Sequence, residues 1–108
     1  MEHLLSLGHR DIAIVTGDMD QPASQERLGG AMKAVSENGL PESSIRIING
    51  KFSMESGHDA VSDILGTGKI PTAIFFMNDE MASGGIRAFH EKSKYKIPED
   101  VSASRAHP

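Results

Sequence analysis

Short apolar runs alternate with helical stripes along this chain. The runs Ile12–Val15 and Ala73–Met77 are continuous, and Ile45–Ile48 is a weaker third run that Arg46 interrupts. Strands that read as continuous apolar runs are buried on both faces, which is typical of parallel sheets covered by helices. The pattern therefore predicts three strands of one parallel sheet.

Between these runs, apolar residues recur at the spacing of one helix face. The first helix is predicted to stop at Gly39, with Pro41 shortly after it, a common C-terminal signature. The second is predicted to begin at Ser53 as its N-cap and to close at Gly66, and the third to begin with Asp79 as its N-cap. The stripes are Leu28, Ala31, Met32 and Val35; Ala60, Val61, Ile64 and Leu65; and Met81, Ala82, Ile86 and Phe89.

The order of elements becomes α-β-α-β-α-β-α when the leading segment Glu2–Leu7 is counted as the end of an earlier helix. Such alternation predicts an α/β fold, a three-layer doubly wound and mostly parallel sheet with helices on both faces. The 108 residues fit one domain. Val101-Ser102 resembles the start of another strand, but Ala103–Pro108 supplies no apolar run to complete it. We therefore expect an unfilled edge of the sheet there.

Composition and charge narrow the classes of function. The chain has no cysteine, which excludes disulfides and thiolate metal sites. Its net charge of −4 and its single basic cluster, Lys92, Lys94 and Lys96, argue against direct binding of nucleic acid. The longest apolar run is far below the ~20 residues of a membrane span, and no signal-peptide pattern begins the chain. We expect a cytoplasmic protein without a membrane partner.

Motifs for catalysis are weak. Gly66-Thr67-Gly68-Lys69 resembles part of a phosphate loop, but Ile70 stands where that loop needs Ser or Thr. No Gly-x-Gly-x-x-Gly follows a strand, and the histidines form no zinc frame. Asp18 and Asp20 could act as paired carboxylates, although such loop acids more often cap, turn or bind polar groups. We expect no enzyme, cofactor or metal; a small-molecule enzyme on a flavodoxin-like fold is a rival that rests on these two acids.

Open α/β sheets bind ligands in the crevice beyond the carboxyl ends of their strands. This rule selects three segments of the chain, the Gly17–Arg27 loop, the Gly50–Ser53 turn and the Asn78-Asp79 turn. We expect the ligand site where these segments meet.

Side chains in these segments have suitable chemistry. The guanidinium of Arg27 offers five donors in a fixed fork for hydroxyls, carboxylates or phosphates; a surface salt bridge is the alternative. Phe52 offers a flat apolar face on which a sugar ring or a base stacks; packing into the core is the alternative. Asn78 has a donor and an acceptor for adjacent hydroxyls, whereas Asp79 only accepts and is the expected cap.

Five motifs occur along residues 2–102 in the order and spacing of a known family. They are His3-Leu4-Leu5-x-Leu7-Gly8-His9-Arg10-x-Ile12-Ala13, Gly17 with Ser24-x-x-Arg27-Leu28-x-Gly30, Gly50-x-Phe52-Ser53-x-Glu55-Ser56-Gly57, Pro71-Thr72-Ala73-Ile74-Phe75 with Asn78-Asp79-x-Met81-Ala82-x-Gly84, and Ile97-Pro98-Glu99-Asp100-Val101-Ser102. Together they resemble the LacI/GalR family of bacterial transcription regulators, although each motif alone is weak.

The resemblance implies an organisation and a set of partners. Residues 1–102 would form the C-terminal lobe of a periplasmic-binding-protein-like effector domain, and residues 103–108 a non-family tail. The implied partners are a small-molecule effector, a sugar or a nucleoside-like compound, and operator DNA contacted only through a headpiece absent from this chain. The full-length parent is expected to be a homodimer. The alternative is a fragment of a transport-linked, periplasmic-type sugar-binding protein.

The resemblance also implies roles for the residues that match the motifs. Arg27 would hydrogen-bond the effector, Phe52 would stack on it, and Asn78 would bind its hydroxyls, with Asp79 and Gln21 beside them. Lys51 stands where the family often has Asp, and we expect this change to alter the effector preference.

Overall fold

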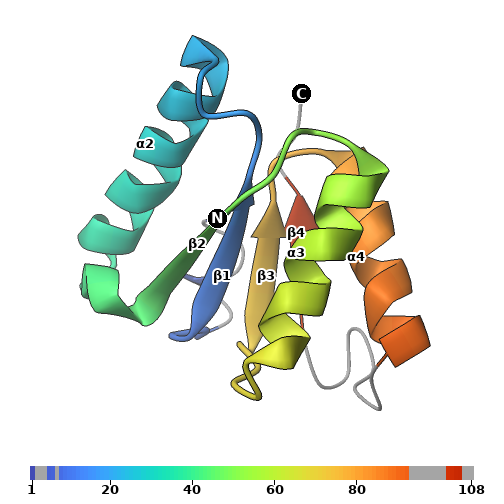
Figure 1. The fold of residues 1–108 in the computed structure, drawn as a ribbon. Helices are drawn as coiled ribbons and strands as arrows, with labels where there is room; N and C mark the ends of the chain where they lie inside the picture. Colours follow the sequence, from blue (N-terminus) through green and yellow to red (C-terminus); the bar gives the residue numbers. More distant parts are fainter. Residues whose placement is uncertain (2–4, 7, 93–101, 106–108) are drawn as a thin grey trace.

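The computed structural model describes residues 1, 5, 6 and 8–92, together with the backbone of 102–105. Three strands alternate with three helices, as predicted, and each of these strands ends within one residue of its expected limit (Figure 1). The leading segment Glu2–Leu7 lies mostly outside the described residues. The elements are β1 (Ile12–Thr16), α2 (Pro22–Glu37), the short 3-10 helix η1 (Glu42–Ser44), β2 (Ile45–Asn49), α3 (Met54–Gly66), β3 (Ala73–Phe76), α4 (Asp79–Lys92) and β4 (Ser102–Arg105).

The strands form one parallel sheet in the order β2-β1-β3-β4. From β1 the chain moves to one side to form β2, and it then crosses to the other side to form β3 and β4. Because such crossovers are right-handed, α2 lies on one face of the sheet and α3 and α4 lie on the other (Figure 1). The predicted three-layer, doubly wound fold is confirmed, and its topological switch point lies between β1 and β3.

The core is centred on β1 and β3, all of whose residues are buried. In β2, by contrast, only Ile45 is buried, and Ile47 is 47% exposed. The expectation that all three apolar runs are buried on both faces is therefore wrong for β2. This strand lies at an edge of the sheet, where the helix layers cover it incompletely.

The segment after Val101 also differs from the sequence-based expectation. The backbone of Ser102–Arg105 forms β4, with Ser102 opposite Ala73 and Arg105 opposite Phe76. A strand can be added at the edge of a sheet through backbone hydrogen bonds alone, so the missing apolar run does not prevent it. The assignment of residues 103–108 to a non-family tail remains a prediction.

The ends of the helices follow the predicted signals with one exception. The hydroxyl of Ser53 accepts a hydrogen bond from Ser56 N at 3.1 Å and caps α3, and Gly39 follows α2 with a φ of 76°. The predicted N-cap of α4 was wrong: Asn78 Oδ1 accepts from Met81 N at 2.9 Å, while Asp79 is the first residue of the helix. Among the described residues, no helix has the length and apolar content needed to cross a membrane.

Helices α3 and α4 pack with their backbones in contact. A Cβ added at Gly57 would overlap the backbone of Met81, and one added at Gly84 would overlap the carbonyl of Met54. Only residues without a side chain can occupy these two positions. The crossing places the first turns of both helices next to each other at the carboxyl edge of the sheet.

A small ionic cluster joins the same two helices farther along. Glu91 of α4 lies 2.8 Å from Arg87 Nε and 3.5 Å from His58 Nε2 of α3. The hydrogen bond with His58 is the largest cause of a lowered pKa for Glu91, and Arg87 acts in the same direction. These groups are exposed enough for solvent and salt to screen their charges, so the cluster stabilises the packing of the two helices only weakly.

Candidate functional site

The carboxyl ends of the strands bring the three predicted segments together. Gly50 N donates to Thr16 O at 2.9 Å, and Met77 N donates to Val15 O at 3.1 Å. The segments after β2 and β3 therefore begin beside the end of β1, at the switch point. In open α/β sheets this is the place where ligands bind.

Phe52 lies directly over the segment that follows β1. Its backbone φ of 66° is in the left-handed region, which a residue with a side chain rarely adopts. A Cβ added at Gly17 would overlap the Phe52 ring, so the ring can take this place only because residue 17 is glycine. The ring is half-buried and packs against the hydrophobic core, which is the alternative considered for it. Its role as a stacking face for a ligand remains a prediction.

Asn78 connects this aromatic residue to α4. Its Nδ2 donates to Phe52 O at 2.9 Å, and its Oδ1 accepts from Met81 N at 2.9 Å. Each end of the amide makes a structural hydrogen bond, which leaves one N–H and one lone pair for a ligand. The role of Asn78 as a hydroxyl ligand remains a prediction, and the structure adds a positioning role.

Arg27 reaches the same edge from α2. Its Nη1 donates to the carbonyl of Met77 at 3.1 Å, across 50 residues of sequence. This contact is not the surface salt bridge considered as the alternative for Arg27, because its partner is a backbone carbonyl. Arg27 is exposed, and its guanidinium keeps further N–H donors for a ligand.

The remaining candidates surround this cluster. Gln21 is exposed and is the N-cap residue that precedes α2, but its side chain makes no cap hydrogen bond. Asp79 is exposed in the first turn of α4. Asp18 Oδ1 accepts from Asp20 N at 3.0 Å, an Asx-type turn. This is the more ordinary of the two roles considered for the loop acids.

Two fully buried residues carried little distinctive signal in the sequence. Met77 is fully buried, and its sulfur accepts from Gly17 N at 3.2 Å while its carbonyl holds Arg27. In the sequence it only ends an apolar run. Ser24 of α2 is also fully buried, and within the described residues its hydroxyl has no hydrogen-bond partner. The sequence marked Ser24 only as part of a motif.

Comparisons with known proteins agree on one family. Residues 1–103 match the family model described as a periplasmic binding protein-like domain. The chain is 39% identical over 101 residues to the HTH-type transcriptional repressor PurR of Actinobacillus pleuropneumoniae, which covers 94% of this chain and 30% of that protein.

Solved structures of regulators share the fold. A sugar-binding transcriptional regulator of the LacI family from Escherichia coli is 38% identical with a TM-score of 0.86, covering 96% of this chain and 37% of that chain. A LacI family regulator from Enterococcus faecium, solved with bound ribose, is 32% identical with a TM-score of 0.82, covering 94% and 37%. The chain thus spans about a third of the length of the proteins that it matches.

Proposed function

The chain belongs to the periplasmic binding protein-like domain family and, within it, to the LacI/GalR regulators, and from this premise we propose that it is the C-terminal lobe that senses a small-molecule effector. The effector is a sugar or a nucleoside-like metabolite. It binds between the carboxyl edge of this lobe and a second lobe of the full-length regulator. Contact with operator DNA belongs to a headpiece outside this chain, and the regulator works as a cytoplasmic dimer.

The observation that carries the proposal is one connected cluster at the switch point. Arg27 bonds to Met77, the sulfur of Met77 accepts from Gly17, the ring of Phe52 lies on Gly17, and Asn78 bonds to Phe52. The guanidinium, the aromatic ring and the carboxamide come from three different segments and are linked through Met77 and Gly17. This combination suits a ring with several hydroxyls or a heterocyclic base.

Binding can regulate only through a difference between two states. An effector held by both lobes favours the closed arrangement, and it shifts the equilibrium by its differential affinity for the closed and open forms. The lobe needs no catalytic group for this task, and the paired-carboxylate alternative loses support because Asp18 is engaged in a turn. The regulators among the relatives support this function over a transport-linked sugar-binding protein.

The test is isothermal titration of the full-length regulator with ribose and with a purine nucleoside. Arg27→Ala removes charge-assisted hydrogen bonds and Phe52→Ala removes the stacking face, so each is expected to weaken binding about tenfold or more. Arg10→Ala is the matched control, because Arg10 is an exposed arginine at the opposite edge of the sheet. If the bound compound keeps its full affinity for both Arg27→Ala and Phe52→Ala, the site assignment fails.

A further inference from the structure

The opposite edge of the sheet carries a second hollow with its own chemistry. Because the strands are parallel, the residues just before β1, β2 and β3 meet at one edge, away from the effector site. They enclose an open hollow of about 540 Å³. We call it the amino-edge hollow, and it is lined by Arg10, Asp11, Ser43, Ser44, Arg46, Lys69 and Ile70.

The charge of the amino-edge hollow opposes that of the whole chain. Arg10, Arg46 and Lys69 bring three cations to it, and Asp11 is the carboxylate among its lining residues. The chain as a whole carries a net charge of −4. Asp11 Oδ1 lies 3.4 Å from Arg46 Nη2 and its side chain is 53% exposed, so this ion pair neutralises the hollow weakly. The lining residues therefore keep an excess of positive charge.

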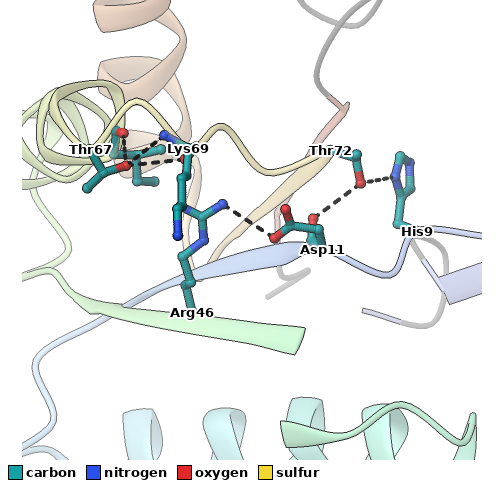
Figure 2. Close-up of polar contacts among 7 residues, drawn as sticks. His9, Asp11, Arg46, Thr67, Lys69 and Thr72 are labelled. Atoms are coloured by element: carbon teal, nitrogen blue, oxygen red, sulfur yellow. Dashed lines mark hydrogen bonds and ion pairs between the residues drawn. The ribbon is translucent and has the colours of Figure 1, made fainter. Parts of the chain in front are cut away.

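Arg46 is held in place by a neighbouring turn. Its Nη1 donates to Lys69 O at 2.6 Å. That turn is itself anchored by Thr67, whose hydroxyl donates to Ile64 O at 2.6 Å and accepts from Lys69 N at 3.2 Å (Figure 2). The guanidinium thus has a fixed position, with N–H groups left over for a ligand.

The start of β1 is anchored from the other side. Asp11 O accepts from Thr72 N at 2.9 Å and from the Thr72 hydroxyl at 3.2 Å. The same hydroxyl lies 2.9 Å from His9 Nδ1 (Figure 2). The segments that carry the three cations are therefore joined to one another, and a ligand would not have to order them first.

We propose that the amino-edge hollow binds a phosphate group, either as inorganic phosphate or as the phosphate of a small metabolite. The planar fork of Arg46 suits two phosphate oxygens, Arg10 and Lys69 supply further charge, and Ser43 and Ser44 can donate hydroxyl hydrogen bonds. Nucleic acid is a poor fit, because it needs an extended basic surface and this cluster is confined to one hollow. The proposal does not depend on the effector site at the other edge.

The experiment follows backbone amide NMR signals of the chain while inorganic phosphate or ribose 5-phosphate is added at constant ionic strength. Saturable shifts are expected at residues 10, 43, 44, 46 and 69 with both compounds, and none there with neutral ribose. Tighter binding of ribose 5-phosphate assigns the site to a phosphorylated metabolite. Equal affinities assign it to the phosphate group alone.

Variants distinguish a specific phosphate site from a general electrostatic attraction of anions to the chain. R10Q/K69Q removes two positive charges whose side chains take no part in the hydrogen bonds that join these segments. It is expected to weaken phosphate binding about tenfold or more. K33Q/K92Q removes two exposed lysines elsewhere and is the charge-matched control. Arg46→Lys keeps the charge but loses the fork, and weaker binding is again expected.

The proposal is overturned by any of three results: no saturable shift at these residues, an equal loss of affinity in K33Q/K92Q, or unchanged affinity in R10Q/K69Q. Thermal unfolding gives a second measurement that does not rely on NMR. Phosphate should raise the Tm of the unaltered chain and of K33Q/K92Q, and should leave the Tm of R10Q/K69Q nearly unchanged.

Discussion

Asn78 is the residue at which fold and site meet. A non-glycine residue in the left-handed region costs roughly 1–3 kcal/mol unless its surroundings hold it there. Phe52 is in that conformation, and Asn78 Nδ2 donates to its carbonyl while Oδ1 caps α4. The place of the aromatic ring in the site thus depends on a side chain 26 residues away.

Substitutions at Asn78 should separate its two hydrogen bonds. Asn78→Ala loses both and is expected to lower the free energy of unfolding by about 2 kcal/mol. Asn78→Asp keeps the cap acceptor and loses the N–H that reaches Phe52, so a loss of about 1 kcal/mol is expected. Urea unfolding measures both. Asp79→Ala should lower the free energy of unfolding by less than Asn78→Ala does. The opposite order would mean that Asp79 is the N-cap of α4, as the sequence predicted.

At the scale of elements, the contact between α3 and α4 determines where two segments of the site lie. Both helices begin at the carboxyl edge, α3 after Phe52 and α4 after Asn78. Their close approach depends on Gly57 and Gly84, each of which faces the backbone of the other helix. A wider crossing would move the start of α4 away from the Phe52 carbonyl and break the bond between these residues.

Gly84→Ala should therefore destabilise the protein even though alanine favours helices. Its Cβ would overlap the carbonyl of Met54, and forcing a side chain into a packed interior typically costs 1–3 kcal/mol, so a loss of about 2 kcal/mol is expected. Gly29→Ala is the control, because nothing lies within 4 Å of a Cβ there and about 0.5–1 kcal/mol of added stability is expected. Unfolding curves of equal stability for the two variants would contradict the close packing.

At the scale of the whole molecule, one parallel sheet separates two kinds of chemistry. Its carboxyl edge carries the aromatic ring and the carboxamide of the proposed effector site, and its amino edge carries the basic hollow. Since the chain covers about a third of its relatives' length, the carboxyl edge is proposed to supply only one wall of a cleft between lobes.

Under the proposed function, the chain by itself should consequently bind an effector much more weakly than the proposed full-length regulator. With one wall of contacts, the affinity for ribose or a purine nucleoside, whichever binds, is expected to fall by at least about tenfold. Parallel titrations of the two proteins measure this ratio, and cooperative thermal unfolding of the chain shows that it is folded in the assay. Equal affinities would mean that this lobe holds the whole site.

The sequence alone determined the order of elements, the parallel sheet and the three segments that meet at its carboxyl edge. These depend on local patterns: buried apolar runs, helical stripes, a Ser53 cap and the rule that ligands bind beyond the carboxyl ends of strands. It also marked Arg27, Phe52 and Asn78, because their motifs and their places after strands are visible in the chain.

Only the tertiary structure decided how these residues are held. The contacts from Arg27 to Met77, from Asn78 to Phe52 and from Arg46 to Lys69 join segments 50, 26 and 23 residues apart. No local pattern encodes them, because they depend on which strands become neighbours and how closely the helices pack. The exposed edge strand β2 and the basic hollow have the same origin. The position of a strand in the sheet, rather than its residue types, decides whether helices cover it and which charged side chains come together at its end.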